Sequence, residues 1–257
     1  MKRIVKIVFS LFVTLLMAGT VSAQSDLVAC GGDKIIMIDS RKSTSLKAHI
    51  SWTWQVAEAT ELPEAYRKIM VPLDECKPVQ GGKQLLITSS GGGVALLDVA
   101  SKKVLFYANS PMAHSAEMLP GGKIAVTLST HAKGNSIELY DSKRNAYCLF
   151  KDSLYSGHGV IWNEKLKRLF ALGFNELRSY CLVNWNSPKP LLVLEKSWPL
   201  PDEGGHDLSY VSDNEMLVST HHNVFSFDIK KKSSRCLNHL QGSMILKLLI
   251  IIKALKG

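Results

Sequence analysis

A repeated segment, spaced by 40 to 48 residues, is the feature that most constrains this fold. Residues 114–127 read HSAEMLPGGKIAVT, 206–219 read HDLSYVSDNEMLVS, and 158–173 read HGVIWNEKLKRLFALG. Residues 74–87, DECKPVQGGKQLLI, have the same pattern with Asp74 where the other three segments have a histidine. A period of this length is typical of the four-stranded blades of a β-propeller.

One repeat divides into four predicted strands. They are expected at 116–119, 123–128, 136–140 and 146–151, with Gly and Asn in the intervening turns. Several strands are continuous apolar runs, for example Leu85-Leu86-Ile87, as expected where a sheet is packed on both faces. No sustained helical period occurs in the mature chain before residue 240. The sequence therefore predicts an all-β propeller.

The first blade is expected to lack a strand. Residues 26–30, 34–39 and 51–57 correspond to the second, third and fourth strands of a blade, and no first strand precedes them. In propellers, that strand is usually supplied by the other end of the chain, which removes an open sheet edge. We predict five to six blades, the last of them incomplete.

The two ends of the chain are expected to lie outside the propeller domain, residues 24–232. Residues 1–23 have the charge, apolar stretch and small-residue site of a signal peptide, with cleavage after Ala23. A periplasmic or secreted protein with no transmembrane anchor after cleavage is therefore predicted. Residues 233–257 lack the strand pattern, and two explanations stay open: a truncated or frame-shifted product, which we favour, or an improvised closing segment.

Charge and cysteine content exclude some classes of function. The formal net charge is +9, but three of these charges lie in the leader and the other lysines are scattered in turns. A nucleic-acid partner is not expected, because such proteins carry clustered basic residues. The five cysteines show no CxxC or metal-knuckle spacing. We expect buried free thiols, with Cys30, Cys148 and Cys181 inside apolar runs, and the sequence leaves any disulfide pairing open.

The repeated histidines are the main candidates for chemistry. His114, His158 and His206 lead the innermost strands of three consecutive blades, so equal registers would aim their imidazoles at one mouth of the axis. Asp74 leads the innermost strand of the blade before. Imidazole and carboxylate suit a divalent ion such as Mn, Zn, Ni or Fe. The alternative is that these histidines cap strands by bonding to a neighbouring blade.

Other candidates are ligand-contacting residues. Glu117 and Asp207 lie close to the histidines in sequence, and His131, His221 and His222 occupy loops that rim either this mouth or the outer surface. Trp185 and Trp198, which we expect in loops, are candidates for stacking on sugar rings, whereas Trp52, Trp54 and Trp162 are expected in the core. No nucleophile elbow, HExxH motif or phosphate-binding loop is present, so catalytic residues stay unknown.

The segments HSAEMLPGGKIAV, SGHGVIWNEKLKRLFAL and GGHDLSYVSDNEMLVSTH resemble an uncharacterised family of secreted bacterial β-propellers. The resemblance covers about residues 26–232 and implies a six-bladed fold and an exported protein, but no activity. A weaker similarity, in the histidine positions alone, is to oligogalacturonate lyases, seven-bladed propellers that hold a divalent metal with histidines in the central channel.

Three functions remain open from the sequence. The first is a binding module that takes a carbohydrate or peptide at the channel mouth. The second is a metal-dependent, lyase-like enzyme acting on acidic sugars through His114, His158 and His206. The third is a scaffold for a surface protein complex. A fold alone does not select among these functions.

Overall fold

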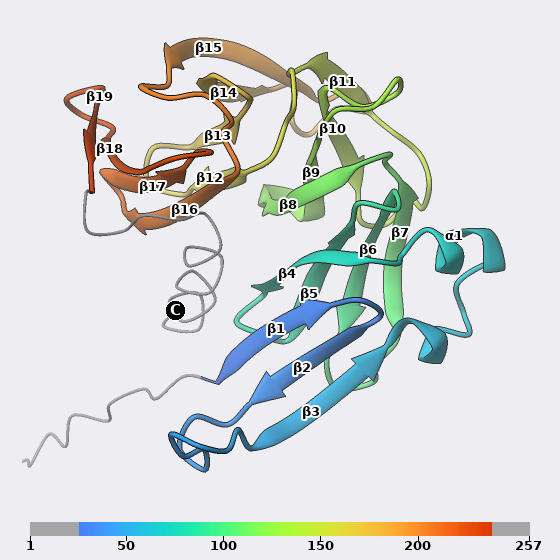
Figure 1. The fold of residues 1–257 in the computed structure, drawn as a ribbon. Helices are drawn as coiled ribbons and strands as arrows, with labels where there is room; N and C mark the ends of the chain where they lie inside the picture. Colours follow the sequence, from blue (N-terminus) through green and yellow to red (C-terminus); the bar gives the residue numbers. More distant parts are fainter. Residues whose placement is uncertain (1–25, 238–257) are drawn as a thin grey trace, which may run out of the picture.

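The computed structural model describes residues 26–237, which form 19 strands in five separate antiparallel sheets (Figure 1). The predicted signal peptide, residues 1–23, and most of the predicted tail, residues 238–257, lie outside the described residues. The prediction of an all-β propeller is confirmed, and residues 26–237 form five blades, one fewer than the family resemblance implies.

Each blade uses consecutive strands of the chain. The first sheet comprises β1 (Leu27–Gly31), β2 (Lys34–Ile38) and β3 (Ile50–Gln55). The second comprises β4 (Leu73–Val79), β5 (Gln84–Ser89), β6 (Gly93–Asp98) and β7 (Val104–Asn109). The third comprises β8 (Ala113–Leu119), β9 (Lys123–Leu128), β10 (Ser136–Asp141) and β11 (Phe150–Ser153). The fourth comprises β12 (Val160–Asn163), β13 (Arg168–Leu172), β14 (Glu176–Val183) and β15 (Leu191–Pro199). The fifth comprises β16 (Asp207–Ser212), β17 (Glu215–Ser219), β18 (Val224–Asp228) and β19 (Ser233–Cys236).

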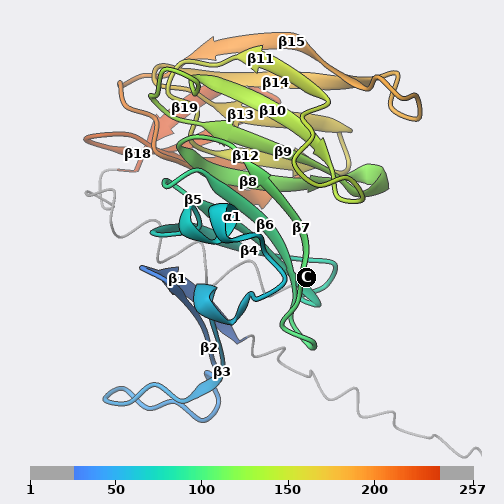
Figure 2. The ribbon, with the colours of Figure 1, turned by 90° about the vertical axis from the view of Figure 1, so that its right-hand side faces the viewer.

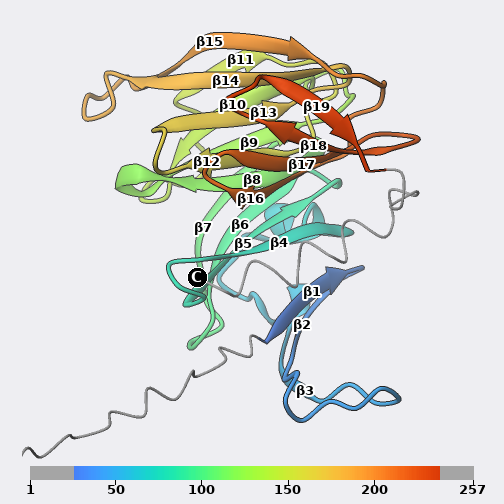
Figure 3. The ribbon, with the colours of Figure 1, turned by 90° about the vertical axis from the view of Figure 1, so that its left-hand side faces the viewer.

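The blades follow one another around an arc. In Figure 1, the first strand of each four-stranded blade lies toward the centre of the arc and the last strand lies toward its outside. Figures 1 and 3 place the second blade between the first blade and the third to fifth blades. The innermost strands β4, β8, β12 and β16 contact one another in sequence order, so residues at the same register of these strands become neighbours around the axis.

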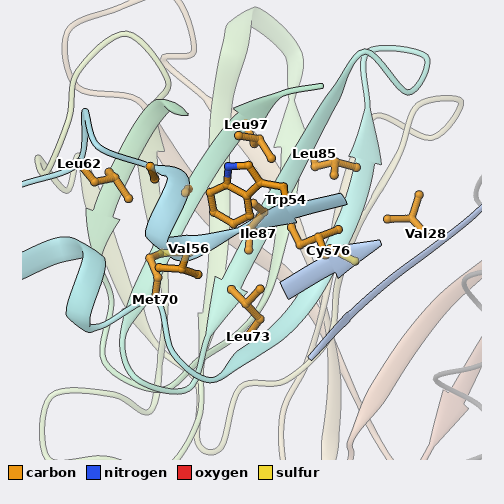
Figure 4. Close-up of a cluster of buried hydrophobic side chains, with 13 residues drawn as sticks. Val28, Trp54, Val56, Leu62, Met70, Leu73, Cys76, Leu85, Ile87 and Leu97 are labelled. Carbon is orange, nitrogen blue, oxygen red and sulfur yellow. The ribbon is translucent and has the colours of Figure 1, made fainter. Parts of the chain in front are cut away.

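The core consists of four apolar clusters, one at each junction between neighbouring blades. This explains the continuous apolar runs, because a middle strand such as β9 is covered on both faces. Figure 4 shows the cluster between the first and second blades, where the Trp54 ring is fully buried beside Leu85, Ile87 and Leu97. The prediction that Trp54 packs in the core is confirmed.

The junctions require close approach of backbones at one point beside the axis. A Cβ on Gly159 would lie 2.4 Å from Cβ of Leu208 in the next innermost strand. Only glycine leaves room for that contact. The glycine directly after His158 therefore fixes how closely the fourth and fifth blades approach one another.

The blade with fewer than four strands is the first one. Strand β1 pairs with β2 and contacts β4 of the second blade, as expected for a second strand whose innermost neighbour is not among residues 26–237. The last described blade has four strands, because Ser233–Cys236, which the sequence assigned to the tail, form β19 beside β18. The propeller fold thus extends past the predicted boundary at residue 232.

Two local predictions are wrong. The fourth strand of the third blade begins at Phe150 and not at Ala146, because Ala146 has a positive φ of 57° and donates its N–H to the carbonyl of Tyr107. Trp198 lies inside β15 and not in a loop.

A short helix, α1 (Glu64–Lys68), occurs in the connection between the first two blades and lies against β7 on the outside of the arc (Figure 2). The Tyr66 and Tyr107 rings are 4.5 Å apart at this contact. No helix within residues 26–237 is long and apolar enough to cross a membrane.

Candidate functional site at the axial mouth

The repeat register brings the predicted leading residues to one mouth of the axis. Asp74 and His114 lie at the second positions of β4 and β8, His206 directly precedes β16, and His158 lies two residues before β12. The backbone N–H groups of His158 and His206 donate to the carbonyls of Leu172 and Ser219, each in the second strand of the same blade. These ladder bonds hold the two histidines at equivalent heights.

The imidazoles form a continuous row across three blades. The His114 and His158 rings stack, with centroids 4.6 Å apart and planes inclined by 12°. His158 meets His206 edge to face at 5.1 Å, and His206 lies 4.8 Å from His221 in the loop after β17. We name His114, His158, His206 and His221 the imidazole row. The sequence is compatible with His221 at this mouth or on the outer surface, and its contact with His206 places it at this mouth.

Asp74 continues the row on the side of the second blade. Nδ1 of His114 lies 2.8 Å from Oδ2 of Asp74, and both side chains are about one-fifth exposed or less. The two groups form an ion pair when His114 is protonated. The prediction that the four leading residues converge is therefore supported by the distances between their side chains.

The arrangement of the rings bears on the predicted metal site. Among residues 26–237, no group of three or more His, Cys, Asp or Glu side chains is placed to hold one metal ion. Stacked, nearly parallel imidazoles direct their nitrogen lone pairs side by side and not toward a shared point. His114, His158 and His206 as arranged do not fit a common ion, and they would have to rotate to coordinate one.

A charged cluster lies next to the imidazole row along the axis. Two of its members, Lys77 and Glu117, stand three residues after the leading residues Asp74 and His114. Nζ of Lys77 in β4 donates to Oε2 of Glu117 in β8 and to the carbonyl of Val160 in β12, both at 3.0 Å. Glu75 lies 3.8 Å from the same ammonium group and accepts hydrogen bonds from Oγ of Ser115 and N of Ala116. Lys77 thus links the second, third and fourth blades across the axis.

The electrostatics of this cluster favour a permanently charged Lys77. Burial alone would lower its pKa, but the carboxylates of Glu117, Glu75 and Asp207 outweigh burial and raise the pKa of Lys77. Burial raises the pKa of Glu117, although the attraction of Lys77 opposes that shift. Both effects follow from placing a cation among carboxylates away from water.

The predicted ligand contacts Glu117 and Asp207 are therefore part of an internal charge network around Lys77. Lys77 itself was not among the predicted site residues. The register of the repeat could have indicated its role, because Lys77 and Glu117 each stand three residues after the residue that leads their strand. Opposite charges at the same register of neighbouring innermost strands come close together around an axis.

The two tryptophans that we predicted as sugar contacts lie away from the imidazole row. Nε1 of Trp185 donates to the carbonyl of Pro120, in the turn at the other end of β8 from His114. The Trp198 ring lies 6.4 Å from the Phe170 ring and 5.4 Å from the Phe227 ring, at the junction of the fourth and fifth blades. Their contacts indicate packing between blades.

The remaining histidines differ in their surroundings. His131 is exposed in the loop after β9, where its Nδ1 accepts a hydrogen bond from the N–H of Lys133. Nδ1 of His222 lies 3.2 Å from Oδ1 of Asp202. A groove of about 440 Å³ lies between the second and third blades, but its lining includes Gln80 and Met118, at the far ends of β4 and β8 from the imidazole row.

Comparisons with known proteins give the family but no activity. A search among curated proteins finds no match to the chain. A model of a protein family matches residues 20–245, which span all the described blades. The chain belongs to that family, a family of unknown function (DUF6528).

Proposed function

We propose that this propeller is a non-catalytic binding protein that takes a carbohydrate at the axial mouth. The observation that carries the proposal is the imidazole row, four rings from three blades in unbroken contact beside Asp74. Imidazole nitrogens and a carboxylate form hydrogen bonds with hydroxyl groups, which sugars present along their whole surface. A propeller supplies such groups on rigid strands.

The charged cluster supports binding and not turnover. Lys77, Glu75 and Glu117 are engaged with one another, so these three acid and base groups already have partners. General acid–base chemistry needs a group within hydrogen-bonding reach of the substrate. The three clustered groups instead support the innermost strands that carry the row.

The test uses a glycan array and a double variant of the row. We expect the mature protein to bind a subset of glycans and the variant His114→Ala/His206→Ala to lose that binding by tenfold or more. The matched control is His131→Ala, which removes an exposed histidine of the third blade outside the row and should bind like the wild type. No glycan binding by folded wild type, or equal binding by the double variant, would contradict the proposal; a peptide array then identifies the other ligand class.

A second candidate is a metal-dependent enzyme acting on acidic sugars, and one contact favours it. Asp74 lies against Nδ1 of His114, as carboxylates lie against imidazoles that bind metals. Elemental analysis of the same samples decides between the two. A stoichiometric divalent metal that disappears in His114→Ala/His206→Ala would favour this second candidate over the first.

A further inference from the structure

Two cysteines of different blades share one apolar cluster. Cys30 lies in β1 of the first blade and Cys76 in β4 of the second, and these two strands contact each other. Cys76 is a buried member of the cluster between these blades, and Cys30 packs against that cluster. Figure 4 shows Cys76 among the apolar side chains that line this junction. The sequence predicts Cys30 inside an apolar run and leaves any disulfide pairing open.

The alternation of β1 directs Cys30 toward the second blade. Val28 and Cys30 are two residues apart, so their side chains point to the same face of the strand, and both belong to the junction cluster. A hydrogen bond with the Cys30 thiol, together with burial, raises the pKa of the Cys76 thiol. Cys30 and Cys76 therefore both face the junction between the first two blades, in strands that contact each other.

The other cysteines lie elsewhere. Cys148 and Cys236 are exposed, and Cys181 is partly buried in β14. The thiol of Cys148 donates to the carbonyl of Phe150, and Sγ of Cys236 lies 3.8 Å from Oδ1 of Asn223. The expectation that Cys148 is buried is wrong, because the fourth strand of its blade begins only at Phe150. These residues provide matched controls for the pair.

We propose that Cys30 and Cys76 are a disulfide site that joins the first blade covalently to the second. The oxidant is an external disulfide, either a protein thiol oxidase or a small-molecule disulfide. The thiolate of Cys30, the more exposed partner, attacks this disulfide and releases one thiol. The Cys76 thiolate then attacks the mixed disulfide at Cys30 and releases the second thiol, so two S–H bonds are exchanged for one S–S bond and the oxidant takes up two electrons and two protons.

The location of the pair gives the bond a structural role. The first blade has three strands, and its innermost position is not filled by any of the described residues. A Cys30–Cys76 bond would close a loop that contains β2, β3 and the whole connection between the first and second blades, including α1. Closing such a loop restricts the unfolded chain and therefore stabilises the folded one.

The experiment oxidises the purified mature chain with oxidised glutathione, blocks the remaining thiols and maps the peptides by mass spectrometry. We expect one linked peptide pair, containing Cys30 and Cys76, that disappears after reduction. The variants Cys148→Ser and Cys236→Ser should retain this linkage. Recovery of both thiols unlinked, or of a glutathione adduct on Cys30 alone, would overturn the proposal, and so would linkage of either residue to another cysteine.

Thermal unfolding gives a second measurement that does not depend on the map. Reduction should lower the Tm of the oxidised wild type by about 5–10 °C. The variant Cys30→Ser changes the less buried partner, so the apolar cluster stays intact, and its Tm should not respond to the reductant. Equal responses of the wild type and Cys30→Ser would contradict a bond between these blades.

Discussion

Lys77 is the residue on which the electrostatics of the axis depend. Its ammonium group holds together Glu117 and Glu75 and reaches the carbonyl of Val160 two blades away. Without a cation at this point, carboxylates from neighbouring strands would face one another with little water between them. A partly buried charge that loses its partner destabilises a protein far more than an exposed one does.

We therefore expect Lys77→Met to lower the free energy of unfolding by about 3–5 kcal/mol. The measurement is denaturant unfolding at neutral pH. The loss should shrink as the pH falls, because the pKa of Glu117 is already raised by burial and its protonation removes the unpaired charge. The double variant Lys77→Met/Glu117→Gln should recover at least half of the loss. A change of less than about 0.5 kcal/mol in Lys77→Met would show that the cluster is well solvated.

At the scale of strands, hydroxyl groups join the second blade to the third and the third blade to the fourth beside the axis. Oγ1 of Thr88 in β5 donates to the carbonyl of His114, and Oγ1 of Thr127 in β9 donates to the carbonyl of His158. Ser219 holds the matching place in β17, and its Oγ is buried without a hydrogen-bond partner among residues 26–237. At this position, the hydroxyl group has a hydrogen-bond acceptor in the second and third blades. In the fifth blade it has none among residues 26–237.

This difference predicts unequal effects of similar substitutions. Thr127→Val removes a donor and leaves the His158 carbonyl short of a partner, so it should lower the free energy of unfolding by about 1–2 kcal/mol. Ser219→Ala removes an unpaired buried group and should change stability by less than about 0.5 kcal/mol. Chemical denaturation of the two variants side by side is the measurement. Equal losses would show that Ser219 has an acceptor in solution.

The inner half of each blade was predictable from the sequence, and the outer half was less so. The first and second strands carry the repeat itself, so the predicted second strand of the third blade coincides with β9. The fourth strands lack such a pattern, and the positive φ of Ala146 gave no signal that distinguishes it from a strand residue. For the site, equal registers predicted the convergence of His114 and His158. The stacked ring orientation depends on side-chain rotation, which no spacing encodes.

At the scale of the whole molecule, stability is divided among junctions between blades. Each apolar cluster joins only two neighbouring blades, so the fold behaves as a series of units with nearest-neighbour contacts. The first blade has one strand fewer than the others and one junction within the described structure. Local opening of this blade should therefore be the easiest opening in the described part of the molecule.

Hydrogen exchange followed by mass spectrometry tests whether the first blade opens more easily than the other described blades. Amides of the first blade, β1 to β3, should exchange at least tenfold faster than those of β8 to β10 in the third blade. The fifth blade is the control, because it also ends the series but has four strands, and its exchange should fall between the two. Equal protection of the first and third blades would show that the missing strand does not weaken the first blade.

The leading residues Asp74, His114, His158 and His206 have a consequence for how this mouth changes between related proteins. Each of four blades contributes one leading side chain from the same structural position, and the sheets behind those positions are held by their own apolar clusters. One member can be exchanged without rebuilding its blade, as Asp74 already illustrates beside three histidines. Selectivity can therefore diverge in single steps, one blade at a time, while the architecture stays constant.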